Sequence, residues 1–268
     1  MNYFMVLVLG VWSFLGIAKQ EACPVAREYI ATYGYLSDQE DFKLSDEEIE
    51  DIAGRVSKGC YGAARRFSTI VDTLVKSRLD TASAIKLGKD LAQRNDGAAE
   101  TFLMVFRASY ASDYLNLDLF QSLNNARSLS FNLDKIPRWL EQDFKDLSAF
   151  CVNDMQIPRP KCAEFVTNVL TKAALQRDED GNPPSVGVAK AFSEGVKYLA
   201  DLDAGPQLAR FEALQMMENL IDISPLALGE FKALYRFSME KEVKPLDRKQ
   251  ALSFAMKVTE GMKQKAAK

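Results

Sequence analysis

The stretch Leu246–Val258, with the sequence LDRKQALSFAMKV, decides the fold because its pattern returns along the chain. Asp247 is a favoured N-cap residue, and Gln250 follows it by three positions, which is the spacing of a capping box. Apolar side chains then share one face of the helix at helical intervals, namely Leu252, Ala255 and Val258. The stretch therefore predicts the start of a helix with one buried face.

The same pattern begins at five other places, at residues 44, 79, 117, 157 and 202, so that successive starts are 35, 38, 40, 45 and 44 residues apart. Counted from each leading apolar residue, two later positions are apolar or small in all six segments. The ninth positions are Ala53, Gly88, Ala126, Val166, Phe211 and Ala255. The twelfth positions are Val56, Leu91, Leu129, Val169, Leu214 and Val258. This shared register indicates a repeat of about six units.

A second apolar helix is predicted after most of these starts, for example at residues 61–77, 98–114 and 137–151. Two-helix units of this length are typical of HEAT and armadillo arrays. The chain resembles such an α-solenoid over about residues 24–262. The resemblance implies an all-α fold, a right-handed stack of antiparallel helix pairs in about six units, with an extended binding surface. The alternative is an irregular helical bundle in which similar caps recur.

The N-terminal stretch at residues 3–18 is apolar and uncharged, and it is short for a membrane span. It is typical of the hydrophobic region of a secretory signal peptide, with Gly16 and Ala18 as small residues at the cleavage site. We therefore predict a signal peptide at 1–18 and a single helical-repeat domain at 19–268, with an exposed loop at 176–185 rich in Pro, Gly and charge. The protein would be periplasmic or secreted. The alternative is an uncleaved anchor that tethers a structural protein to the membrane.

The predicted mature chain holds four cysteines, and an even number behind an export signal suggests disulfides. Cys23 lies at the start of one predicted helix and Cys60 just past the end of the next, so these ends meet in an antiparallel pair. Cys151 and Cys162 flank a corner that contains two prolines. We predict the bridges Cys23–Cys60 and Cys151–Cys162, each contributing about 2–4 kcal/mol.

The composition excludes several classes of chemistry. The chain has no histidine, which removes Ser-His-Asp and Cys-His catalysis and histidine metal ligands. The formal net charge of −3 argues against a nucleic-acid partner. The acids at 47–51 begin a helix, where they favour its dipole. Residues 178–182 lack the ligand spacing of a calcium loop. We expect neither a metal nor a cofactor.

Aromatic and basic side chains recur on the second helices of successive units, and Arg and Tyr are enriched at interface cores. The candidate binding residues are Arg66, Arg107, Tyr110, Lys145 and Arg236. A regular stack could align them in one trough. The alternative is that the charges are solvated and that Tyr110 packs in the core beside Phe106.

These observations favour an exported protein that binds another protein or peptide through its helical face, in a scaffold, inhibitor or immunity role. A histidine-independent enzyme that acts on cell-wall glycan with Glu or Asp is the alternative from another class. It would need two acids facing each other across a cleft, and the sequence contains no motif that predicts such a pair.

Overall fold

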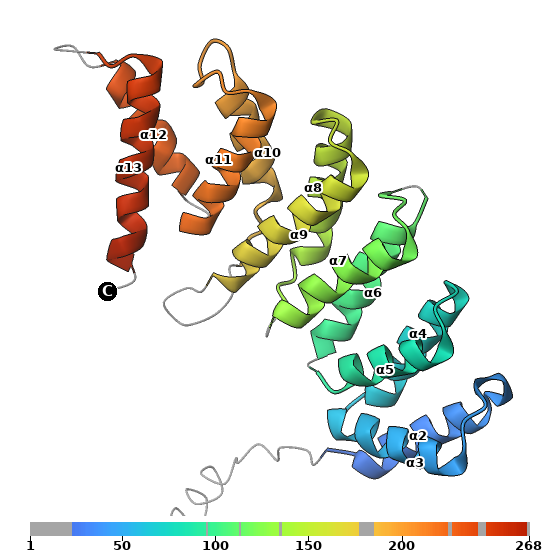
Figure 1. The fold of residues 1–268 in the computed structure, drawn as a ribbon. Coiled ribbons are helices and arrows are strands. Elements are labelled where there is room, and N and C mark those ends of the chain that lie inside the picture. The colour runs from blue at the N-terminus through green and yellow to red at the C-terminus, as the bar shows by residue number, and fades with distance from the viewer. Residues whose placement is uncertain are drawn as a thin grey trace, which may run out of the picture. The chain divides into compact units, whose positions relative to one another are not determined.

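The computed structural model describes residues 23–94, 96–112, 114–133, 136–176, 185–224, 227–240 and 245–266. All regular structure in these ranges is helical, in twelve α-helices that pack against their neighbours, which confirms the all-α fold (Figure 1). The predicted signal peptide at 1–18 and residues 177–184 of the predicted loop lie outside these ranges. The handedness of the stack and its six units stay predictions.

Contacts between Cα atoms divide the chain into two compact units. The single helical-repeat domain expected at 19–268 stays a prediction. Of the described residues, unit 1 comprises 23–75 and 80–94, and unit 2 comprises 76–79 and the residues from 96 onward. Unit 1 contains α2 (Val25–Ser37), α3 (Asp46–Val56), α4 (Ala63–Lys76, whose last residue falls in unit 2) and α5 (Thr81–Ala92).

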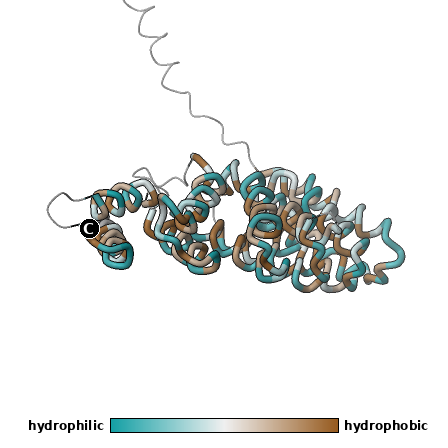
Figure 2. The backbone as a smooth tube through the Cα atoms, turned by 90° about the horizontal axis from the view of Figure 1, so that it is seen from above, coloured by the Kyte–Doolittle hydropathy of each residue, from teal (hydrophilic) through white to brown (hydrophobic). Residues whose placement is uncertain are grey.

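Unit 2 begins its helices with α6 (Asp96–Tyr110), α7 (Leu119–Asn132), α8 (Leu140–Ala149) and α9 (Arg159–Leu175). It continues with α10 (Ala189–Ala200), α11 (Arg210–Ile223), α12 (Ala227–Met239) and α13 (Arg248–Ala266). Hydrophobic and hydrophilic residues alternate along these helices, as expected for helices with one buried face (Figure 2).

Each unit has its own apolar core. Fully buried side chains in unit 1 include Leu36, Phe67, Ile70, Leu74 and Leu91, and those in unit 2 include Phe102, Phe106, Phe144, Phe192 and Phe231. Five of the six ninth positions are buried, because the helices carry them at the predicted register. Phe211 is the exception, and its side chain is 66% exposed.

Most predicted helix starts are confirmed by their caps. At α3, the Ser45 hydroxyl accepts from the Glu48 N–H, and the Glu48 carboxylate accepts from the Ser45 N–H at 2.8 Å, which completes a capping box. The side chains of Asp80, Asp118 and Asp247 likewise accept from the backbone N–H three residues later.

The predicted start at Leu202-Asp203 is wrong. The Asp201 carboxylate accepts from the N–H groups of Asp203 and Ala204, which forms a turn in place of a helical cap. Helix α11 begins only at Arg210. This delay explains why Phe211, in the first turn of α11, points to solvent.

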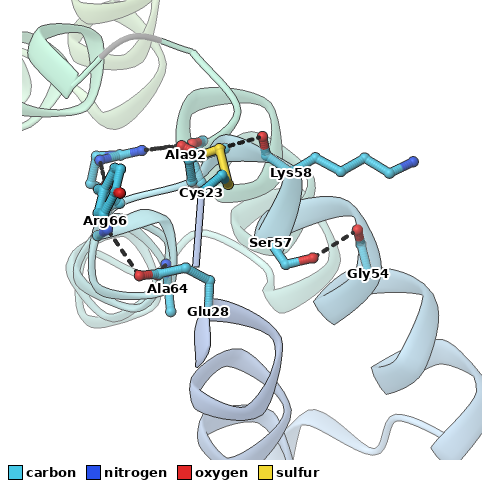
Figure 3. The surroundings of a disulfide bond; sticks show 12 residues. Cys23, Glu28, Gly54, Ser57, Lys58, Ala64, Arg66 and Ala92 are labelled. Atoms are coloured by element: carbon cyan, nitrogen blue, oxygen red, sulfur yellow. Dashed lines mark hydrogen bonds between the residues drawn. A yellow bond between two sulfur atoms is a disulfide. The ribbon is translucent and has the colours of Figure 1, made fainter. Parts of the chain in front are cut away.

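The predicted Cys23–Cys60 bridge is present, with the two Cα atoms 5.1 Å apart, and it joins the start of α2 to the residue after α3 and its short 3₁₀ turn (Figure 3). The predicted Cys151–Cys162 bridge is not formed in the structure, where both residues are buried thiols. Cys151 lies in a π-helical turn, Phe150–Asp154, and the Cys162 thiol donates to the Ser148 carbonyl at 3.7 Å.

Candidate functional site: a groove between α6 and α8

Unit 2 contains a surface groove of about 480 Å³ between α6 and α8, which we call the α6–α8 groove. Helix α6 and the turn that follows it contribute most of the lining, and α8 contributes two residues. The lining residues are Glu100, Leu103, Met104, Arg107, Ala108, Ala111, Tyr114, Glu141 and Lys145. An apolar floor therefore lies beneath two acids, two bases and a tyrosine.

The apolar part of the groove follows from the face that α6 presents. Phe102, Val105 and Phe106 are buried in the core, whereas Leu103 and Met104 lie between the core and the exposed Arg107 and are only partly covered. These half-covered side chains give the groove an apolar floor that solvent still reaches. Covering such a surface with a partner is favourable, because apolar area is removed from water.

The turn after α6 places Tyr114 on the groove. Backbone bonds run from the Tyr114 N–H to the Ala111 carbonyl at 3.2 Å and from the Leu117 N–H to the Ser109 carbonyl at 2.9 Å. Asn116 has a positive φ of 48°, in the left-handed region that asparagine tolerates. The chain reverses here, and Tyr114 stays 42% exposed.

The α8 side of the groove carries an ion pair. The Lys145 ammonium lies 2.8 Å from the Glu141 carboxylate, one helical turn earlier. Glu141 raises the pKa of Lys145, and Tyr114 adds to the rise. A lysine that acts as a base or nucleophile needs a lowered pKa, so Lys145 is suited to binding rather than to chemistry.

The structure brings together two of the five candidate binding residues, because Arg107 and Lys145 both line the α6–α8 groove. Tyr110 does not line it. The ring of Tyr110 stacks on Phe106 at a centroid distance of 5.6 Å and is 38% exposed. The groove tyrosine is instead Tyr114, and its place depends on where α6 ends. We expected this helix to continue to residue 114, but it ends at Tyr110.

Arg66 does not line the groove, and it makes hydrogen bonds within unit 1. Its guanidinium donates to the carbonyl oxygens of Tyr61, Gly59 and Ala92 at 2.6, 3.0 and 3.2 Å, beside the disulfide (Figure 3). These carbonyls lie just after α3 or at the end of α5, where a carbonyl has no N–H partner within the helix. Arg66 therefore ties the corner around Cys60 to the end of α5.

Arg236 lies in the last turn of α12, exposed, and away from the groove lining. Burial raises the pKa of Tyr198 on α10, and the nearby Arg236 partly lowers it. Lys232, one turn earlier than Arg236, lies 4.8 Å from the centre of the Tyr198 ring. This cluster of cations and a tyrosine is separate from Arg107 and Lys145.

Three acids, Glu50, Asp51 and Asp90, line a groove of about 640 Å³ in unit 1, together with the bases Arg55, Lys58 and Lys89. Asp51 of the 47–51 cluster is paired with Arg55 at 2.9 Å, and Glu48 caps α3. Burial raises the pKa of Asp143, but this carboxylate is held by two backbone N–H groups of another helix. A glycan-cleaving acid needs its proton beside the substrate, and Asp143 lies buried away from the groove lining.

The described residues contain no group of three or more His, Cys, Asp or Glu side chains placed to hold a metal ion. Among them no helix combines the length and apolar character needed to cross a membrane. A hydrogen bond with Cys151 and, after it, burial raise the pKa of the Cys162 thiol. A raised pKa lowers the thiolate fraction, so Cys162 is a poor nucleophile.

Comparisons of the chain with protein-family models, with curated proteins and with solved structures found no match.

Proposed function

We propose that the chain is an exported binding protein that takes a segment of another polypeptide into the α6–α8 groove. The observation that supports this function is a partly covered apolar floor, Leu103 and Met104, beneath Arg107, Tyr114 and Lys145. Binding hot spots combine Arg and Tyr with apolar surface that a partner dries. The role fits a scaffold, an inhibitor or an immunity protein equally.

The makeup of the groove favours a polypeptide partner. Met104 has a flexible thioether side chain, which adapts to irregular apolar partners. The charged rim holds Glu100, Arg107, Glu141 and Lys145, two of each sign. A peptide offers an apolar side chain, an acid and a base within one short segment, whereas a neutral glycan offers neither charge nor an aliphatic anchor.

The Cys23–Cys60 bridge supports the compartment that this function assumes. Disulfides persist in secreted and periplasmic proteins and are rare in a reducing cytosol. Together with the predicted signal peptide at 1–18, the bridge favours a periplasmic or secreted protein.

The test is a peptide-display selection against the protein expressed from Lys19, followed by affinity measurement with the selected peptides. The double variant Arg107→Ala/Tyr114→Ala should bind them at least tenfold more weakly, since a hot-spot residue contributes about 2 kcal/mol or more. Both side chains are exposed, so circular dichroism should show an unchanged fold.

The matched control is Phe120→Ala/Lys190→Ala, which removes another exposed aromatic and another exposed cation from unit 2. Phe120 is 71% exposed on α7, and the Lys190 side chain is 88% exposed on α10, both outside the groove lining. This variant should bind as the wild type does. Selected peptides that bind the groove variant at full strength would contradict the proposal, as would a selection that yields none.

A further inference from the structure

The corner of unit 1 at Cys60 combines a disulfide near the surface with a strained backbone. Cys60 has φ 57° and ψ −147°, in a region that residues with a Cβ rarely adopt. Such a conformation persists only where the surrounding contacts impose it. Cys23 and Cys60 are both only half-buried, so the bridge lies at the edge of unit 1 rather than in its core.

Several contacts hold Cys60 in this conformation. The bridge to Cys23 fixes its side chain. The Arg66 guanidinium donates to the carbonyl of Gly59, the preceding residue, at 3.0 Å. Gly59 itself packs on the end of α5 so closely that a Cβ would clash with the Ala92 carbonyl oxygen. Opening the bridge removes one of these constraints, so the strain at Cys60 opposes the stabilisation that the closed loop provides.

We infer that this bridge is a redox-sensitive site at which a small thiol forms a mixed disulfide with Cys23. The thiolate of the small molecule attacks Cys23 Sγ, the S–S bond breaks, and Cys60 leaves as a thiolate that then takes up a proton. A second small thiolate attacks the small-molecule sulfur of the mixed disulfide and releases Cys23 as a thiol. The two small thiols supply the two electrons and end as their own disulfide.

The surroundings of the two sulfurs select Cys23 as the one attacked. Cys60 Sγ lies 3.6 Å from the Lys58 carbonyl oxygen, whose partial negative charge repels an incoming thiolate (Figure 3). The Arg66 guanidinium beside the bridge favours a thiolate on Cys60, and a more stable thiolate leaves faster. After protonation, the Cys60 thiol can donate to the same Lys58 carbonyl.

Opening the bridge acts on the groove of about 640 Å³ in unit 1. Arg55 and Lys58 line this groove just before Cys60, and Lys89 and Gln93 line it at the end of α5. The corner at Cys60 packs against the end of α5, so it connects the two walls. A corner released from its bridge therefore changes how these walls are held together.

The experiment equilibrates the folded protein, expressed from Lys19, with mixtures of reduced and oxidised glutathione. Acid quenching, alkylation in denaturant and peptide mass mapping then measure the free thiol and the attached glutathione at Cys23 and Cys60. The bridge should open in mixtures in which circular dichroism shows the helices still folded. Glutathione should be found on Cys23 roughly tenfold more often than on Cys60, because the leaving rate rises as the pKa of the leaving thiol falls.

Two substitutions at Arg66 test the effect of its charge. Arg66→Lys and Arg66→Gln both remove the guanidinium and its hydrogen bonds to three carbonyls, but only the Lys variant keeps a positive charge. The Lys variant should keep the preference for Cys23, whereas the Gln variant should lose most of it. A purely structural role of Arg66 would change both variants alike and would remove this part of the inference.

Hydrogen exchange measures the release of the corner. On reduction, amides at 57–62 and 89–94 should exchange roughly tenfold faster, whereas those of α9 in unit 2 should not change. A bridge that stays closed until the helices unfold would overturn the inference, as would glutathione found mainly on Cys60 or unchanged exchange at 57–62. Reduction that unfolds unit 1 outright would show a purely structural bridge and would overturn it too.

Discussion

Two buried carboxylates cap helices that lie far from them in the sequence. Glu28 of α2 accepts from the N–H groups of Gly62 and Ala64 at 3.0 and 2.9 Å, at the start of α4. Asp143 of α8 accepts from the N–H groups of Val188 and Ala189, at the start of α10. The first N–H groups of a helix have no partner within it, so each acid stabilises a helix from outside.

Two substitutions at Asp143 distinguish the stabilising effect of its hydrogen bonds from that of its charge. Asp143→Ala leaves the N–H groups of Val188 and Ala189 without the carboxylate and should cost about 1–3 kcal/mol in the free energy of unfolding. Asp143→Asn keeps an acceptor oxygen and should cost less. Urea unfolding followed by circular dichroism measures both variants.

The pH dependence of the Asn variant gives a second readout. Burial raises the pKa of Asp143 in the folded protein. Protonation of this carboxyl therefore stabilises the fold fully below the unfolded pKa, near 4, and this stabilisation is lost as the pH rises through the folded pKa. The stability advantage of the wild type over Asp143→Asn should therefore shrink between pH 4 and pH 7. An advantage that grows with pH would contradict this assignment.

At the scale of the helices, two glycines of unit 1 occupy opposite environments. A Cβ on Gly88 of α5 would lie 2.9 Å from Val71 Cγ2 and 3.2 Å from Phe67 Cδ2, where α4 and α5 pack closely. A Cβ on Gly54, inside α3, would meet nothing within 4 Å. Glycine inside a helix costs about 1 kcal/mol relative to alanine, so only Gly88 offsets this cost through packing.

Alanine substitutions should therefore act in opposite directions. Gly54→Ala should stabilise the protein by up to about 1 kcal/mol, whereas Gly88→Ala should be neutral or destabilising because Val71 and Phe67 must shift. Thermal unfolding by circular dichroism compares the two single variants with the wild type. A gain in stability for Gly88→Ala as large as that for Gly54→Ala would show that the α4–α5 contact is looser than described.

The caps show how far the sequence can predict these elements. Ser45 and Asp247 succeed because their hydrogen bonds close over three residues, within reach of a local pattern. Leu202-Asp203 fails because the residue three positions after Asp203 is Pro206, which has no N–H to donate to a cap, and the segment instead forms a turn on the Asp201 carboxylate. Nothing local marks Glu28, whose partners lie 34 and 36 residues away.

The sequence likewise predicts part of the candidate site, namely its two cations, and misses its tyrosine. Arg107 and Lys145 stand out as cations on successive second helices, and the structure places both on one groove. The tyrosine depends on the last turn of α6. Tyr110 is inside the helix and stacks on Phe106, and Tyr114 lies in the turn. One turn of helix decides which tyrosine reaches the groove, and helix ends depend on tertiary contacts that periodicity does not contain.

For the whole molecule, the two units differ in how they are held together. Unit 1 contains the Cys23–Cys60 bridge, which closes 37 residues over α2 and α3. In the described part of unit 2 the two cysteines are thiols, so its stability there rests on packing and hydrogen bonds. Closing a loop of this length contributes about 4 kcal/mol in the chain-entropy model. A reductant should therefore weaken unit 1 selectively.

The tryptophans allow this difference to be measured. The sequence has two, Trp12 in the predicted signal peptide and Trp139 just before α8 in unit 2. In the protein expressed from Lys19, tryptophan fluorescence therefore reports on unit 2, whereas circular dichroism reports on the helices of both units. Adding dithiothreitol should shift part of the circular dichroism transition to lower urea concentration and leave the Trp139 transition in place.

The variant Cys23→Ser/Cys60→Ser should behave like the reduced protein and show no response to dithiothreitol. Two units that unfold separately give this split, because a constraint in one then leaves the other unchanged. If both signals instead moved together, the units would unfold as one cooperative domain, as the sequence pattern over 19–268 predicts.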